Sequence, residues 1–166
     1  MKEKDLFQIL KESLPHAEIE EREMIVIKVG KEKYLDTMKF LKDLKFDLFI
    51  DLFGTHYPST KEIEVIVHLY STYRIKRIRV KCRVPEDNPS LPSVYNLWNG
   101  ADWFERETYD MLGVRFEGHP NLKRILTPPG FEDHPLRKEF PFRGKIPRKE
   151  KYHPDDKRFI EGEFWF

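Results

Sequence analysis

The sequence predicts an α+β fold, a two-layer sandwich of helices on a mostly antiparallel sheet, followed by an extended, aperiodic C-terminal arm. Apolar residues recur at helical spacing in three stretches. Three consecutive segments are predicted to be strands joined by hairpins, and in two of them β-branched residues alternate with polar ones. After Gly113 this periodicity ends and seven of the 12 prolines follow. We therefore divide the chain into a globular domain, residues 1–112, and an arm, residues 113–166.

The expected elements follow in the order helix, two strands, helix, three strands, helix. Their ranges are 5–14 (helix), 17–20 and 24–29 (strands), 31–44 (helix), 47–53, 62–73 and 74–84 (strands) and 94–112 (helix). Asp5 can cap the first helix and Pro15 ends it. Residues 85–92 are rich in turn formers and predict a loop. The last helix is expected to break near Asn99 and Gly100.

The segment 74–84 alternates strictly between apolar and basic residues, so one face is expected to be buried. The apolar face carries Ile78, Val80, Cys82 and Val84, and the basic face carries Arg77, Arg79, Lys81 and Arg83. Cys82 is interpreted as a small core residue. The basic face predicts either a nucleic-acid-binding module or a solvated surface paired with acids such as Glu62 and Glu64. We favour the solvated surface, because aromatic stacking residues are missing there.

The net charge, the cysteine count and the lengths of the apolar runs exclude several classes of function. The chain has 166 residues, with 30 basic and 29 acidic side chains, so its net charge of +1 gives no general attraction to nucleic acid or membranes. One cysteine excludes a disulfide framework or an all-cysteine iron–sulfur site and fits a reducing compartment. No apolar run approaches the roughly 18 residues of a membrane span. The charged fraction of 36% suits a thermophile with surface ion-pair networks.

The segment 101–141 concentrates the residues that could carry chemistry. Glu105, Arg106, Glu107 and Asp110 crowd one helix, and His119 and His134 each precede a proline. Three interpretations stand: a metal site that adds Asp110, Glu117 or Asp133 to the histidines, a small carboxylate-dependent enzyme using Glu105, Glu107 and His119, or an ion-pair lattice. The lattice is favoured because no nucleophile or cofactor motif accompanies the acids. In it Arg106 pairs with Asp110, and further basic partners are Arg115, Lys123, Arg124, Arg137 and Lys138.

Two blocks of this segment resemble a known family. Residues 105–126, ERETYDMLGVRFEGHPNLKRIL, and residues 134–141, HPLRKEFP, resemble signatures of the thirty-kilodalton subunit of respiratory complex I. The same subunit type occurs in energy-converting membrane-bound hydrogenase-type complexes. The resemblance implies a small α/β domain with a C-terminal arm and no redox cofactor of its own. It places the iron–sulfur clusters and the nickel–iron or quinone site in partner subunits.

The resemblance also implies the partners and the place of the chain. They are the large catalytic subunit and the small iron–sulfur subunit of the same complex, in its hydrophilic arm, peripheral on the cytoplasmic side of the membrane. We therefore expect a non-catalytic assembly subunit, with no nucleic acid as a partner. The residues expected at the partner interface are Glu105, Arg106, Glu107, Asp110, Gly113, Phe116, His119, Pro120, Arg124, His134, Pro135, Arg137, Lys138, Phe140 and Pro141.

Within that interface the expected roles differ. The helix face with Trp103, Phe104, Met111 and Leu112 is expected to pack on the chain's own sheet. Arg124, Arg137 and Lys138 are expected to dock on an acidic surface of the large subunit, with Phe140 and Phe142 as apolar anchors. Charge reversal at Arg124 or Arg137 is expected to weaken assembly and leave the isolated domain folded. Residues 145–166 carry no family motif.

Overall fold

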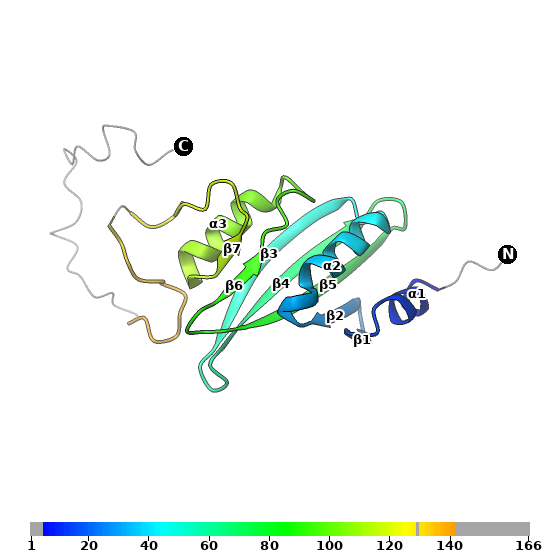
Figure 1. The fold of residues 1–166 in the computed structure, drawn as a ribbon, viewed down its shortest axis with the longest axis horizontal. Coiled ribbons are helices and arrows are strands. Elements are labelled where there is room, and N and C mark those ends of the chain that lie inside the picture. The colour runs from blue at the N-terminus through cyan, green and yellow to red at the C-terminus, as the bar shows by residue number, and fades with distance from the viewer. Residues whose placement is uncertain (1–4, 129, 142–166) are drawn as a thin grey trace.

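The computed structural model describes residues 5–128 and 130–141, and it confirms the α+β class. A five-stranded sheet has the order β1-β2-β5-β4-β3, and a second, two-stranded sheet joins β6 and β7. Figure 1 shows α2 lying across the large sheet and α3 beside β3. The elements are α1 (Leu6–Ser13), β1 (Glu18–Glu21), β2 (Ile25–Val29), α2 (Lys31–Asp43), β3 (Leu48–Tyr57), β4 (Glu62–Ser71), β5 (Lys76–Pro85), β6 (Ser90–Pro92), α3 (Ala101–Leu112) and β7 (Arg115–Glu117).

The large sheet is antiparallel except between β2 and β5. β4 and β5 turn alternate residues toward the helices, as the sequence pattern predicts for β5: Ile78, Val80, Cys82 and Val84 are all buried. Burial raises the pKa of the Cys82 thiol to about 12, so this thiol is protonated at neutral pH. The interpretation of Cys82 as a core residue is confirmed.

Several local predictions need correction. β3 continues to Tyr57 because its ladder with β4 runs on through the pair Tyr57 and Glu62. The expected loop at 85–92 contains β6, which gains its strand partner, β7, only from a segment about 25 residues further along. Asp5 stands at the N-cap of α1, but its side chain makes no capping hydrogen bond. The predicted break near Asn99 and Gly100 is confirmed, since α3 begins at Ala101, but the helix expected before the break is wrong, because residues 94–100 form turns.

The buried stripe of α3 consists of residues 101, 105, 108 and 112, which share one face of the helix. Leu112 reaches the sheet at Gly54, where an added Cβ would lie 2.4 Å from its Cδ1. Phe104 packs on Phe49, with ring centroids 5.9 Å apart. Trp103 was expected on this face, and that prediction is wrong: it lies on another side of the helix and is 62% exposed. The prediction from hydrophobicity failed because the buried face of α3 includes polar residues, Glu105 and Thr108.

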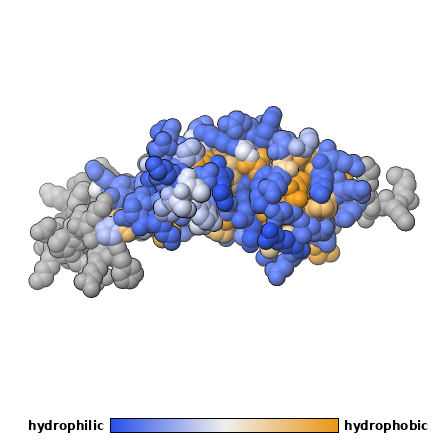
Figure 2. Space-filling view, turned by 90° about the horizontal axis from the view of Figure 1, so that it is seen from below, coloured by the Kyte–Doolittle hydropathy of each residue, from blue (hydrophilic) through white to orange (hydrophobic). Residues whose placement is uncertain are grey.

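The packed core continues past α3, because Val114 and Phe116 are buried. Leu122, which follows β7, also packs against this core. The division of the chain at residue 112 remains a sequence-based prediction. Among the described residues no helix is long and apolar enough to cross a membrane. In the view of Figure 2 most of the surface is hydrophilic, and hydrophobic residues show mainly in the half that carries the N-terminus.

Candidate functional site

Asp110, near the end of α3, holds the first part of the arm. Its side chain is completely buried. Its Oδ2 accepts hydrogen bonds of 2.7–2.9 Å from three successive backbone N–H groups, those of Ile125, Leu126 and Thr127. Its Oδ1 accepts from the Thr127 hydroxyl and, at 2.9 Å, from Arg124 Nη1. Burial tends to raise the pKa of this carboxyl, but the hydrogen bonds outweigh burial and lower it.

Arg124 links the hydrogen bonds around Asp110 to the second part of the arm. Its Nη1 and Nη2 donate to the carbonyls of Asp133 and Glu132, at 2.9 Å each. The predicted ion pair between Arg106 and Asp110 is wrong, because Arg124 occupies that carboxylate. Arg106 instead lies over the ring of Trp103 and donates to the Lys123 carbonyl.

The block 134–141 caps the C-terminal end of α3. The last carbonyls of a helix have no partner inside it, and here three successive ones each accept a hydrogen bond from the arm. The pairs are Asp110 with His134 Nδ1 (2.9 Å), Met111 with the Leu136 N–H (3.0 Å) and Leu112 with Arg137 Nε (2.8 Å). The arm therefore completes the helix, and the arginine sits where the helix dipole favours a cation.

Gly113 makes this cap possible. Its φ of 80° lies in the left-handed region, and a Cβ there would come within 2.6 Å of His134 Nε2. Burial lowers the pKa of His134 more than the hydrogen bond to the Asp110 carbonyl raises it, so the ring is neutral at pH 7 and its Nδ1–H donates.

The two arginines predicted to dock on a partner are engaged within the chain. Arg124 binds Asp110 and the arm, and Arg137 caps α3. Because each reversal removes internal hydrogen bonds, we now expect charge reversal at either position to destabilise the isolated domain as well. A further contact of these residues with a partner stays a prediction. Lys138 is exposed.

Glu105 anchors a second cluster at the other end of α3. Its side chain is completely buried, Oε1 accepts the Val94 N–H at 2.7 Å, and Oε2 accepts the Ser93 hydroxyl at 2.6 Å. Burial raises the pKa of Glu105 to about 7, against the two hydrogen bonds, and nearby Asp102 adds to the rise. The Glu105 carboxyl therefore changes between its protonated and ionised forms near neutral pH, although it is buried in the core.

His119 completes this cluster from the arm. Its ring is buried, and Nδ1 accepts the Asn121 N–H, so Nε2 carries the proton. Nε2 lies 3.0 Å from Asp102 Oδ1 and 3.9 Å from Glu105 Oε2, but neither contact is aligned as a hydrogen bond. Glu107 is exposed on another side of α3, so the catalytic trio of Glu105, Glu107 and His119 does not come together.

The metal interpretation finds no support either. His119 and His134 lie in separate clusters, the Asp110 carboxylate is saturated by the arm, and Glu117 pairs with Lys31 at 3.7 Å. Within the described ranges, 5–128 and 130–141, no three acidic, histidine or cysteine side chains gather as a metal site.

Sequence reasoning missed His56. Its ring is buried at the end of β3, with Nε2 2.7 Å from Glu86 and Nδ1 accepting the Lys138 N–H at 3.1 Å. Glu139 lies 3.2 Å from the same Nδ1. His56 thus fastens the arm to the sheet. No local signal could reveal it, because its partner Lys138 is 82 residues away along the chain.

The remaining predicted residues take varied positions. Phe116 is buried in the core, and the ring of Phe140 packs at a tilt against that of Phe131, with centroids 5.9 Å apart. Pro120 and Pro141 are exposed, and Pro135 is half-buried. Phe142 and residues 145–166 lie outside the described residues. The basic face of β5 pairs with acids as expected: Lys81 and Arg83 reach Glu64 at 2.9 and 3.0 Å. The nucleic-acid interpretation therefore lacks support.

The fold and the site define the class of protein: a small α+β protein whose C-terminal arm is bound to its last long helix. More particularly, the chain belongs to the family described as the 30 Kd subunit of the respiratory-chain NADH dehydrogenase, whose model matches residues 27–146. It is 45% identical over 130 residues to a C-type subunit of the NADH-quinone oxidoreductase of Rhizobium meliloti, covering 76% of this chain and 69% of the relative. It is 46% identical over 143 residues to the mitochondrial "NADH dehydrogenase [ubiquinone] iron-sulfur protein 3" of Candida albicans, covering 84% and 50%.

Two solved structures agree with the fold. A trypsin-resistant fragment of Nqo5 superposes with a TM-score of 0.62 at 30% identity, covering 69% of this chain and 97% of that one. A chain of the membrane-bound sulfane sulfur reductase, an archaeal respiratory membrane complex, superposes with a TM-score of 0.69 at 28% identity, covering 81% and 83%. The resemblance of the signature blocks to this family is confirmed.

Proposed function

We propose that the chain is a non-catalytic assembly subunit that docks on the large catalytic subunit of its complex, close to the small iron–sulfur subunit. The observation that carries the proposal is a set of exposed apolar side chains on α3 and on the arm bound to it, Trp103, Leu126 and Leu136, which we call the ridge. Each of these side chains is more than half exposed. Exposed apolar residues that gather on one surface mark protein contacts.

The hydrogen bonds of the arm place these three residues along the same helix. The backbone N–H groups of Leu126 and Leu136 bond to Asp110 and Met111, which are neighbours in α3. Trp103 lies on the same helix and supports Arg106. Asp110 and Arg137 thus hold the arm in place, and the side chains of Leu126 and Leu136 remain exposed.

The chemistry of the clusters supports a non-catalytic role. Glu105 and the ring of His119 are closed off from solvent, so a substrate has no access to them. In this proposal the redox cofactors lie in the partner subunits. The chain itself is placed at the cytoplasmic side of the membrane, as a peripheral part of the hydrophilic arm.

The ridge is tested with Leu136→Asp in the native complex. The variant places a carboxylate in an apolar contact, where its burial is costly. The amount of large subunit that co-purifies with a tagged copy of this chain is therefore expected to fall by about tenfold or more. The Leu136 side chain is solvent-exposed in the free chain, so its unfolding midpoint is expected to stay unchanged. Co-purification followed by quantitative mass spectrometry provides the measurement.

Ile75→Asp is the matched control. Ile75 is 76% exposed in the turn between β4 and β5, at the opposite end of the sheet from His56 and the end of the arm. This variant makes the same chemical change away from the ridge and is expected to assemble normally. Full recovery of the large subunit with Leu136→Asp would show that the ridge is not the contact.

A further inference from the structure

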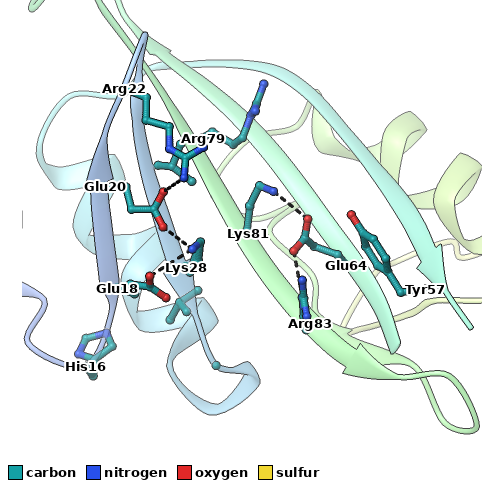
Figure 3. Close-up of a pocket in the computed structure, with 13 residues that line it drawn as sticks. His16, Glu18, Glu20, Arg22, Lys28, Tyr57, Glu64, Arg79, Lys81 and Arg83 are labelled. Atoms are coloured by element: carbon teal, nitrogen blue, oxygen red, sulfur yellow. Dashed lines mark hydrogen bonds and ion pairs between the residues drawn. The ribbon is translucent and has the colours of Figure 1, made fainter. Parts of the chain in front are cut away.

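The face of the large sheet opposite the helices forms a broad, charged hollow of about 750 Å³. Figure 3 shows its side chains rising from β1, β2, β5 and β4. Its floor includes Val26, which is almost fully buried. The charged residues that line it are the cations Arg22, Lys28, Arg79, Lys81 and Arg83 and the anions Glu18, Glu20 and Glu64.

All but one of these cations have an acidic partner. Arg22 pairs with Glu20 at 2.7 Å, and Lys28 contacts both Glu18 and Glu20. On the other side Lys81 and Arg83 share Glu64. In Figure 3 dashed lines join these groups, and none reaches Arg79.

Arg79 lies between the two paired groups, on the central strand β5. Its Nε donates to His68 Nε2 at 2.8 Å, so this guanidinium is held in place by a neutral ring. In the part of the chain that the structure describes, its two terminal nitrogens meet no carboxylate. A half-buried guanidinium without an acid leaves a strong, bidentate donor unused.

We propose that this face is a second docking surface, and that Arg79 receives a single carboxylate from a partner protein in the complex. The proposal rests on the proposed function, in that the chain must be assembled, but it concerns a surface separate from the α3 ridge. Four of the five cations are already paired with Glu18, Glu20 and Glu64, so only one guanidinium lacks an acid. A polyphosphate chain or an anionic membrane would need several unpaired cations, whereas one carboxylate matches a single guanidinium. One carboxylate, flanked by uncharged or basic residues, fits this charge pattern.

The test replaces Arg79 by lysine in the intact complex. Arg79→Lys keeps the positive charge and introduces a primary amine, which a zero-length carbodiimide reagent couples to a carboxylate in contact with it. We expect a new cross-link between residue 79 and an acidic peptide of another chain, absent from the unaltered complex. Arg79→Glu is expected to reduce recovery of that chain by about tenfold or more, since it sets two carboxylates against each other.

Lys39→Glu is the matched control, because it reverses an exposed charge on α2, on the helical side of the sheet. A cross-link of residue 79 only to this chain's own acids, or to a second copy of the chain, would overturn the proposal, as would normal assembly of Arg79→Glu. If Arg79→Glu fails to fold, the cross-link of Arg79→Lys still decides. If Leu136→Asp disrupts assembly and Arg79→Glu does not, the sheet-face docking surface alone is rejected. If Arg79→Glu disrupts assembly and Leu136→Asp does not, the ridge alone is rejected.

Discussion

The two sides of the molecule carry charge in different ways. On the α3 side, Asp110 and Glu105 are completely buried, and their oxygens accept mainly from backbone N–H groups and hydroxyls. On the open sheet face, Glu62 and Glu64 instead meet the side chains of Lys81 and Arg83. The first arrangement joins distant parts of the chain, whereas the second joins neighbouring strands that the ladder already holds.

This contrast separates structural charge from surface charge. A buried carboxylate that organises three backbone N–H groups costs a great deal to remove, since those groups lose their acceptor inside the protein. On the open sheet face, breaking a partly exposed pair such as Glu62 with Arg83 costs little, because water then solvates both partners. Glu64 is the exception on this face, because its side chain is buried. The family signature falls on the first kind, which explains why its acids and arginines resemble an active site in the sequence.

Asp110→Ala tests the first side and has the largest expected effect. It removes the acceptor of three N–H groups and of Arg124. Breaking a buried charge pair in this way is expected to cost about 3–5 kcal/mol of unfolding free energy. Urea unfolding measures the loss, and hydrogen exchange is expected to show faster exchange at residues 125–127. Equal protection of those amides in both proteins would contradict the structural role of Asp110.

Glu105→Gln tests the buried acid through pH. The folded pKa of about 7 lies above the ordinary value of 4.5, so the folded state holds this proton more strongly between the two values. Stability from Glu105 is therefore fully present below about pH 4.5 and falls as pH rises toward 7, by on the order of 3 kcal/mol. The glutamine variant lacks this fall.

The measurement compares urea unfolding of the two proteins between pH 4.5 and 8. Taking the difference between them cancels His134, whose lowered pKa acts in the opposite direction over part of this range. The variant is expected to gain stability relative to the unaltered chain as pH rises, and the difference is expected to level off near about pH 8, where Glu105 has lost its proton in both states. A difference that does not change with pH would show that Glu105 is ionised throughout.

Much of the fold could be predicted because its signals are local. The alternation in β5 determines which of its faces is buried, and the stripe with Tyr34, Met38 and Leu41 predicts α2. The parallel pairing of β2 with β5 and the strand β6 depend on segments far apart in the chain, so no local pattern reports them. Trp103 is exposed because the buried face of α3 includes Glu105 in its place. Hydrophobicity alone would predict the opposite, a buried Trp103 and an exposed Glu105.

The candidate site was likewise predictable only where its signals are local in the sequence. Its residues could be found from the signature blocks, but their partners could not. Arg124 and Arg106 are both plausible partners for Asp110 in the sequence, and only the path of the arm selects Arg124. His56 has no signal at all, since it meets Lys138 through folding alone. Residue types therefore predict that charges pair, and tertiary structure decides which charges do.

Glu62→Gln tests the open sheet face and has the smallest expected effect. Glu62 reaches Arg83 at 3.2 Å, and both side chains are about one third to one half exposed. Water and salt screen this pair, so its loss is expected to change the unfolding free energy by about 0.5 kcal/mol or less. Unfolding in low and in high salt provides the measurement, and the small difference is expected to vanish in high salt. A loss of several kcal/mol that persists in high salt would place this pair with Asp110, and the distinction between the two sides would fail.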